Sequence, residues 1–264
     1  MSERSAPVAD AESVPPQPSD DASAPSRSGR VIRGTTGFIG EVLLTVGVLL
    51  LLVVVYDLWW TNVVAAQNAD QQRQELLSDW GDDEDPVVTD SGGDPGPPEA
   101  VVPVDGEAFA LIYIPRLKDK VWGLPLVEGV SDEDLAQGIS HFPGAALPGQ
   151  KGNFALAGHR ATHGEPLRDI DQLVEGDEVI IETETGWYVY RMTQDAIVSP
   201  YDVWVVDPVP GQDAGTVPTE RIITLLTCNP RWASYERWAW WGRLDDSFHK
   251  DLGTPEAIRE VEQA

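Results

Sequence analysis

Residues 221–230 read RIITLLTCNP, and this stretch joins an apolar strand to the single cysteine of the chain. Ile222, Ile223 and Thr224 are β-branched, a residue type enriched in strands, so residues 221–227 are predicted to form one. Pro230 cannot continue a central strand because it has no N–H to donate. Cys228 is therefore expected at the end of a strand, with its side chain facing a loop.

Similar signals for short strands recur through the C-terminal half of the sequence. They occupy residues 108–114, 121–127, 154–156, 177–183, 187–193 and 238–244. Only residues 184–186 separate the fourth from the fifth, which predicts a hairpin. Ser131, followed by three acids, indicates a short helix that Gly138 would end, and residues 254–264 are helical in type. Many short strands with one or two short helices indicate a β-barrel or a β-sandwich.

A long apolar segment precedes this part of the chain. Residues 42–56 contain no charged side chain, and the wider stretch 38–60 is 23 residues long. At about 1.5 Å per residue, a helix of this length covers about 34 Å, which is enough to cross a bilayer. Trp59 and Trp60 would lie at one interface. The sequence therefore predicts a single transmembrane anchor at residues 34–61.

The charges that flank this segment give its expected orientation. Arg27, Arg30 and Arg33 lie on the N-terminal side, whereas the other flank is mainly acidic. The positive-inside rule puts the N-terminus in the cytoplasm and the residues after the span on the extracytoplasmic side of the cell membrane. A cleavable signal peptide is the alternative, because residues 64–66 loosely resemble a cleavage site. The long N-terminal preamble and the long span favour an uncleaved, single-pass anchor.

Composition divides the rest of the chain. Residues 1–33 are rich in Ser, Ala, Pro and Asp and have no hydrophobic period, which predicts a disordered cytoplasmic segment. Residues 62–104 are expected to begin as a helix and to continue as a linker, in which residues 79–99 hold eight acids and no basic residue. Such a linker repels itself and stays extended. A folded domain at 105–250 and a tail at 251–264 complete the expected organisation.

The overall composition excludes some classes of partner. Acidic residues outnumber basic ones by 44 to 18, and a net charge of −26 repels phosphate backbones, so no nucleic-acid partner is expected. A single cysteine excludes an intramolecular disulfide. One cysteine and four histidines also argue against a structural zinc site. We expect neither a metal nor a cofactor.

A lone cysteine is usually a small buried hydrophobic residue, but the strand-end location of Cys228 favours a nucleophile. A thiol nucleophile needs an acid–base partner, usually histidine. Of the four candidates, His159 directly follows an apolar strand and a glycine, as a reactive side chain at a strand end would. His163 is expected in a surface turn and His249 in a polar tail. His141 is the fourth candidate, and location favours His159 only modestly.

Acyl chemistry at a thiol also requires a group that stabilises the developing oxyanion. Arg231, Arg237 and Arg243 all follow Cys228 closely. Spacing does not choose among them, and surface ion pairs with the many acids are the alternative explanation for all three.

Four stretches resemble one protein family. TLLTC at 224–228 matches the TLxTC signature of sortases, and HFPGAALPGQKGNFALAGHR at 141–160 is similar to the segment around the sortase catalytic histidine. YDLWWTN at 56–62 and IYIPRL at 112–117 are similar to class E sortases of high-GC Gram-positive bacteria. One departure is Ala145, where the family pattern has threonine. The resemblance implies a closed β-barrel of about eight strands, with one or two short helices, after a single transmembrane helix.

The resemblance also implies a set of site residues. Cys228 would be the nucleophile, His159 the acid–base partner, and Arg237 the residue that binds the substrate backbone and stabilises the oxyanion. Thr227 would help to hold substrate beside the thiol. Tyr113 matches a tyrosine implicated in the preference for LAxTG-like over LPxTG-like signals.

The implied reaction is acyl transfer on secreted proteins that carry a C-terminal sorting signal. The enzyme would cleave a Thr–Gly bond, keep the acyl part as a thioacyl intermediate, and pass it to an amine of the peptidoglycan cross-bridge or of lipid II. Two alternatives remain open at this stage. An L,D-transpeptidase also pairs cysteine with histidine but places them close together in sequence. A non-catalytic extracytoplasmic barrel that binds cell-wall or secreted proteins would have an unreactive Cys228.

Overall fold

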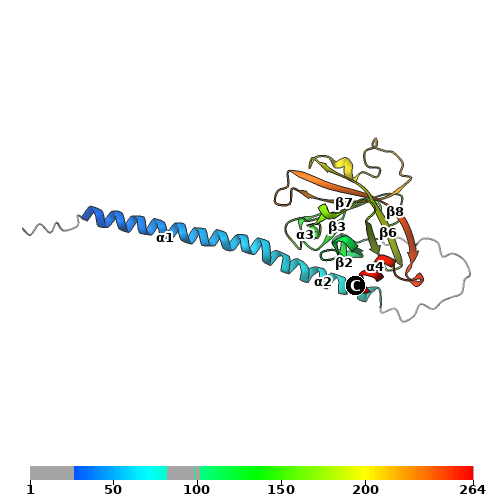
Figure 1. Ribbon diagram of the computed structural model, residues 1–264, viewed down its shortest axis with the longest axis horizontal. Coiled ribbons are helices and arrows are strands. Elements are labelled where there is room, and N and C mark those ends of the chain that lie inside the picture. Colours follow the sequence, from blue (N-terminus) through cyan, green and yellow to red (C-terminus); the bar gives the residue numbers. More distant parts are fainter. Residues whose placement is uncertain (1–26, 82–97, 99–101, 264) are drawn as a thin grey trace, which may run out of the picture. The chain divides into compact units, whose positions relative to one another are not determined.

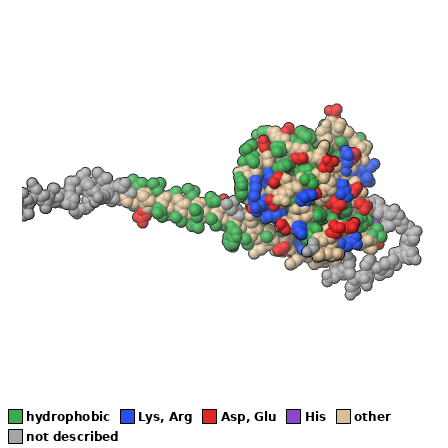
Figure 2. All heavy atoms as spheres, viewed as in Figure 1, with side chains coloured by type: hydrophobic (Ala, Val, Ile, Leu, Met, Phe, Trp, Pro, Cys, Tyr) green, Lys and Arg blue, Asp and Glu red, His purple; other side chains and the backbone are tan. Residues whose placement is uncertain are grey.

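The computed structural model describes residues 27–81, 98 and 102–263, and the chain divides into two compact units between Leu51 and Leu52 (Figure 1). The first unit contains most of helix α1 (Arg27–Val55). Within it, Gly37–Val55 is long and apolar enough to cross a membrane, and apolar side chains cover this helix in Figure 2. The predicted span was longer, at residues 34–61, and residues 27–33 were expected without regular structure. They are helical instead, because a helix propagates readily once an adjoining segment has nucleated it.

The second unit begins with helical turns that lead into the folded domain. A π-helical segment (Tyr56–Trp60) connects α1 to α2 (Thr61–Asp79). Ala65, Ala69 and Leu76 are the buried residues of α2, and their spacing puts them on one helical face. The predicted acidic linker lies largely outside the described residues, as do residues 1–26 of the predicted N-terminal segment.

The domain is a closed barrel with strand order β1-β2-β3-β4-β7-β8-β6-β5, which confirms the predicted fold class. The strands are β1 (Ala108–Tyr113), β2 (Trp122–Glu128), β3 (Ile139–His141), β4 (Gly152–Gly158), β5 (Glu178–Glu182), β6 (Gly186–Val198), β7 (Arg221–Asn229) and β8 (Glu236–His249). Short helices α3 (Asp132–Leu135) and α4 (Glu256–Gln263) complete it, with single 3-10 turns at Pro115–Leu117, Ile170–Gln172, Val203–Val206 and Lys250–Leu252. The pairs β2–β3 and β4–β7 are parallel, whereas the other neighbours are antiparallel.

Most of the predicted strands are confirmed, including the hairpin of β5 and β6. The prediction missed one strand and made several others too short. The three-residue strand β3 was missed because it is too short to show alternation. Strand β8 is longer than the predicted 238–244, since pairing with β6 carries the charged residues Asp245 and Asp246 into the strand.

Side-chain alternation gives the barrel an interior and an outer face. Ile223 and Leu225 of β7 and Trp240 of β8 point into the interior core. Val205, Ala239 and Trp241 form a smaller cluster on the outside, where the loop between β6 and β7 covers the sheet. A further outer cluster, with Leu76 of α2 and Ile258 of α4, covers β1, β5 and β6. These faces determine which strand ends remain accessible.

Candidate active site

Cys228 is the penultimate residue of β7, so the predicted location at a strand end is confirmed, and its side chain is half-buried. His159 directly follows β4, the parallel neighbour of β7. The register pairs Ala157 with Leu226, so its continuation by two residues sets His159 beside Cys228.

Two side-chain hydrogen bonds hold this continuation of the register. The Thr227 hydroxyl donates to the Gly158 carbonyl at 2.7 Å, and Nη1 of Arg160 donates to Oδ1 of Asn229 at 2.5 Å. These bonds connect the residues immediately before and immediately after His159 and Cys228. Neighbouring strands are about 4.8 Å apart, so the backbones of His159 and Cys228 lie side by side.

Arg237 is the cross-strand partner of Cys228 in the antiparallel pair β7–β8. Its Nη1 donates to the carbonyls of Ser234 and Glu236 at 2.8 and 2.9 Å, and it makes no ion pair with another described residue. The other two candidate arginines are engaged by acids.

Arg231 pairs with Glu165 at 2.6 Å and Arg243 with Glu220 at 3.2 Å. Arg243 also lies opposite Ile222, six residues before Cys228, which corresponds to about 20 Å along the strand. Of the three arginines, Arg237 is therefore the one that the fold brings to the thiol.

Alternation puts all three side chains on the outer face of the barrel. Leu225 of β7, Trp240 of β8 and Leu156 of β4 point into the core. Counting along each strand, Cys228, Arg237 and His159 point outward. A thiol, an imidazole and a guanidinium thus share one face of the barrel.

His159 lies in an environment that favours its neutral form. Its ring stacks on that of His163, with centroids 4.9 Å apart and an interplanar angle of 29°. Burial lowers the pKa of His159, the charge of His163 lowers it further, and Asp132 partly opposes both effects. His163 does lie in a turn, as predicted, but its contact with His159 could not be foreseen from sequence.

The other two histidines do not reach this surface. His141 is 1% exposed, and its ring nitrogens face Glu128 Oε2 at 2.5 Å and the Ala146 carbonyl at 3.1 Å. His249 ends β8, at the opposite end of that strand from Arg237. His159 is the histidine that lies beside the cysteine.

Thr227 and Tyr113 differ in their relation to the site. Thr227 is 3% exposed and points inward, so its hydroxyl bonds to Gly158 and fixes the strand ends. The structure does not bring Tyr113 to the site. Its strand, β1, lies across the barrel from β7, and its buried hydroxyl donates to Glu182 at 2.6 Å. Burial against Trp122 and Trp187 raises its pKa.

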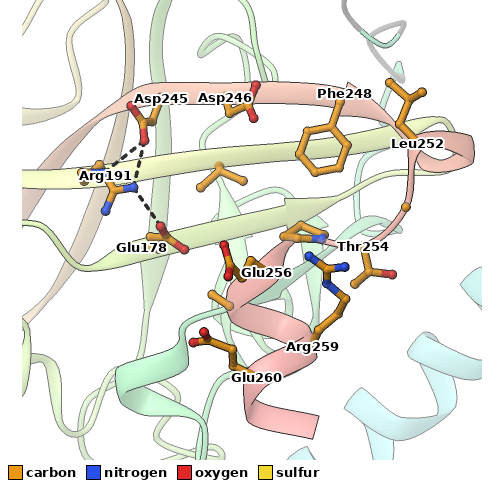
Figure 3. Close-up of a pocket in the computed structure, with 14 residues that line it drawn as sticks. Glu178, Arg191, Asp245, Asp246, Phe248, Leu252, Thr254, Glu256, Arg259 and Glu260 are labelled. Carbon is orange, nitrogen blue, oxygen red and sulfur yellow. Dashed lines mark hydrogen bonds and ion pairs between the residues drawn. The ribbon is translucent and has the colours of Figure 1, made fainter. Parts of the chain in front are cut away.

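No group of three or more metal-ligating side chains occurs among the described residues. A pocket of about 720 Å³ lies between the outer face of β5, β6 and β8 and the C-terminal helix α4 (Figure 3). Its lining includes Glu178, Asp245, Glu256 and Arg259, and Arg191 bridges the first two of these. Cys228, His159 and Arg237 do not line this pocket.

The chain is similar to several known proteins in sequence. The family model described as the sortase domain matches residues 112–245. Sortase SrtE1 of Streptomyces coelicolor is 37% identical over 228 residues, which cover 83% of this chain and 60% of that relative. The chain thus spans less than two thirds of SrtE1. Sortase SrtE2 of the same organism is 37% identical over 227 residues, which cover 83% of this chain and 85% of the relative.

A solved structure has the same fold. Sortase E from Streptomyces avermitilis is 41% identical and superposes with a TM-score of 0.53, over 59% of this chain and 99% of that one. The predicted resemblance is confirmed, because the family model spans half of the chain and SrtE2 is matched over most of its length. The chain belongs to the sortase family.

Proposed function

We propose that the chain is a cysteine transpeptidase that cleaves the sorting signal of secreted proteins at a Thr–Gly bond and transfers the acyl part to a cell-wall amine. The observation that carries the proposal is the row formed by His159, Cys228 and Arg237. Cys228 and Arg237 lie opposite each other on β7 and β8, His159 directly follows the neighbouring strand β4, and all three point to the outer surface.

The first half-reaction uses each of these residues once. The Cys228 thiolate attacks the threonine carbonyl carbon, and the guanidinium of Arg237 stabilises the oxyanion that develops. The protonated imidazole of His159 gives its proton to the leaving glycine nitrogen as the C–N bond breaks. The lowered pKa makes that imidazolium a stronger acid and also reduces its population at neutral pH. A thioester to Sγ and a free amine result.

The second half-reaction reverses these roles. An amine of the peptidoglycan cross-bridge or of lipid II attacks the thioester carbonyl, and neutral His159 accepts the amine proton. The C–S bond breaks, which regenerates the Cys228 thiolate and the imidazolium. Net chemistry is the exchange of one amide for another, without a cofactor or an oxidant.

Apolar side chains near the Cys228 thiol suit a sorting signal that contains an apolar residue. Val198, Leu226 and Val206 are partly buried apolar side chains in the outer cluster that lines this face. They offer contact area for a leucine that precedes the scissile bond. Because Tyr113 lies elsewhere, the preference for alanine over proline at the second signal residue is supported by family resemblance alone.

The apolar segment Gly37–Val55 supports a membrane anchor. The arginines before it favour a cytoplasmic N-terminus, with the barrel outside, where sorting signals and cell-wall amines are found. Such an enzyme would meet its protein substrates during their export.

Replacing Cys228 by alanine tests the function directly. The variant is expected to retain a folded barrel, checked by circular dichroism, and to lose all turnover of fluorogenic LAxTG and LPxTG peptides. Intact-mass spectrometry of the unsubstituted enzyme with peptide alone should show an adduct of the acyl part, which hydroxylamine releases. Retained turnover in Cys228→Ala would exclude the proposal. A thiol that is unreactive toward iodoacetamide in the unsubstituted protein would favour the non-catalytic barrel.

A further inference from the structure

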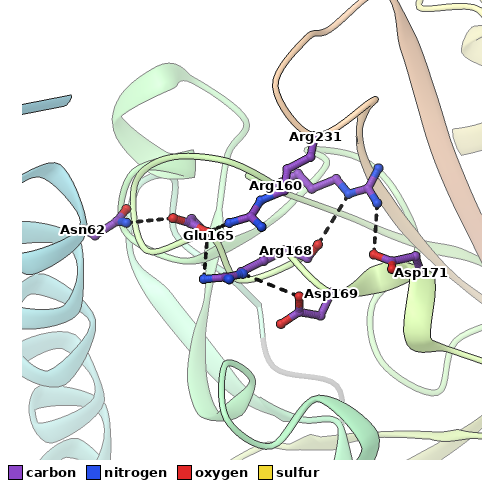
Figure 4. Close-up of polar contacts among 7 residues, drawn as sticks. All are labelled: Asn62, Arg160, Glu165, Arg168, Asp169, Asp171 and Arg231. Carbon is purple, nitrogen blue, oxygen red and sulfur yellow. Dashed lines mark hydrogen bonds and ion pairs between the residues drawn. The ribbon is translucent and has the colours of Figure 1, made fainter. Parts of the chain in front are cut away.

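The carboxylate of Glu165 is 5% exposed and is held by side chains from distant parts of the chain (Figure 4). Nδ2 of Asn62, on α2, donates to one carboxylate oxygen at 2.9 Å, and Nη2 of Arg231 donates to the other at 2.6 Å. Arg168 adds a longer ion pair of 3.6 Å. A buried carboxylate is unfavourable unless it is paired and hydrogen-bonded, so these partners depend on one another. We call Asn62, Glu165 and Arg231 the Glu165 clamp.

The Glu165 clamp fixes a loop with an uncommon backbone. His163 and Glu165 have φ values of 53° and 52°, in the left-handed region that residues other than glycine rarely adopt. The Asn62 side chain holds this loop twice, since its Oδ1 also accepts from the Gly164 N–H at 2.9 Å. Backbone in this region persists only where the surroundings impose it, and it gathers at functional sites. In this loop, the left-handed backbone positions the His163 ring, which stacks on the His159 ring.

The same clamp reaches the segment that follows the nucleophile. Arg231 lies three residues after Cys228, and its guanidinium is held between Glu165 and the ring of Trp232, whose centroid is 4.7 Å away. The Glu165 clamp thus connects the loop after His159 with the loop after Cys228. Removing one partner would free both loops.

Asn62, the third residue of the Glu165 clamp, lies on α2, the helix that leads from the apolar span to the barrel. Ala65 and Ala69 of α2 are buried, and the Ala65 methyl lies close enough to Gly164 for an added Cβ there to be in contact at 3.5 Å. Helix α2 is therefore packed against the same loop that Asn62 holds.

We propose that the Glu165 clamp positions the reacting groups, so that the helix leading from the membrane span is a working part of the active site. This inference rests on the proposed function, in which His159 and Cys228 carry the chemistry. Asn62 binds Glu165 and Gly164 through its side chain, and it acts as a positioning residue through the His163–Glu165 loop. A sortase domain released from α2 would keep its three reacting residues and lose part of their alignment.

The test compares two asparagines of the same helix in the full chain, purified into lipid nanodiscs. Asn62→Ala removes the clamp, whereas Asn68→Ala changes an exposed asparagine of α2 and serves as the matched control. We expect kcat for a fluorogenic signal peptide to fall about tenfold in Asn62→Ala, with KM within about twofold, and to stay unchanged in Asn68→Ala. Asn62→Asp keeps the shape and the acceptor for Gly164 but opposes the Glu165 carboxylate, and it should lose activity similarly.

A second readout does not depend on turnover. Histidine titration followed by NMR should show the pKa of His159 moving up toward its ordinary value in Asn62→Ala, because the released loop no longer buries that ring or keeps His163 against it. Asp132, which opposes these effects, is left in place. The rate losses of Asn62→Ala and Arg231→Ala should also combine to less than their product, since both act through Glu165.

Two results would overturn the inference: an Asn62→Ala variant that matches Asn68→Ala in both kcat and the pKa of His159, or fully multiplicative losses in the double variant. Failure of the proposed function has a different signature, because Cys228→Ala would then retain turnover. The His159 titration would still report whether the clamp holds the loop.

Discussion

Replacing Thr227 by valine isolates the hydrogen bond that aligns the two strand ends. Valine has nearly the shape of threonine, so the substitution removes only the hydroxyl that donates to the Gly158 carbonyl at 2.7 Å. Thr224 provides a matched control on the same strand, because it is also buried and its hydroxyl donates to Oδ1 of Asn153 at 2.6 Å. Thr224 lies four residues from Cys228, about 13 Å along the strand.

The two valine variants should lose similar amounts of stability. A buried acceptor that loses its donor costs about 1–3 kcal/mol. For a domain of this size, each kcal/mol lowers Tm by about 2–4 °C, so we expect Tm to fall by about 2–12 °C in both variants. Differential scanning fluorimetry measures this shift, and both proteins should remain folded at 25 °C.

The two valine variants should differ in catalytic rate. The bond from Thr227 aligns the residues that precede His159 and Cys228, and a misplacement of about 1 Å can cost about 100-fold in rate. We expect kcat/KM for a fluorogenic signal peptide to fall at least about tenfold in Thr227→Val, which corresponds to about 1.4 kcal/mol. In Thr224→Val it should change less than about twofold. Equal rate losses in the two variants, or full activity in Thr227→Val at reduced stability, would refute the alignment role.

Three further predictions follow from the geometry. Arg237→Ala should lower kcat/KM by about 100-fold or more, as for loss of an oxyanion donor, while Arg243→Ala stays near the unsubstituted value in peptide assays; the reverse order would show that a different arginine serves the site. Tyr113→Phe should lower the free energy of unfolding by about 1 kcal/mol, measured in urea, because it removes a buried hydrogen bond. The ratio of LAxTG to LPxTG turnover should be the same in Tyr113→Phe as in the unsubstituted enzyme. An altered ratio would show that Tyr113 does influence which signal is preferred. His163→Asn should raise the pKa of His159, since it removes a like charge while asparagine tolerates the left-handed backbone; an NMR titration with an unchanged or lower pKa would contradict that electrostatic coupling.

Local sequence signals predicted the features that depend on neighbours along the chain. β-Branched residues before Cys228 and the proline after it predicted a strand end, and β7 ends at Asn229. An apolar run that ends at Gly158 predicted a strand end at His159, which directly follows β4. Sequence did not predict that these two strand ends are adjacent, because β4 and β7 form a parallel pair whose connection contains two other strands, β5 and β6, and two 3-10 turns. Family resemblance provided that connection before the structure did.

Features that depend on contacts between distant residues were not predictable. Tyr113 lies on a strand that resembles the family segment, yet its side chain points into the outer cluster with Trp187 and away from Cys228. Glu165 meets Asn62 across 103 residues of sequence. No local pattern marks such a pair, and the left-handed backbone of Glu165 is not signalled by a glycine.

The choice among the three arginines depends on the residue at which β8 begins. In an antiparallel pair, each step back along one strand is matched by a step forward along the other. With β7 ending at Asn229 and β8 beginning at Glu236, that rule alone sets Arg237 opposite Cys228 and carries Arg243 to Ile222. The predicted strand began at 238, so it left Arg237 in a loop and the rule could not be applied. Two additional residues of strand, which tertiary pairing with β6 and β7 stabilises and local propensity does not, decide which cation faces the thiol.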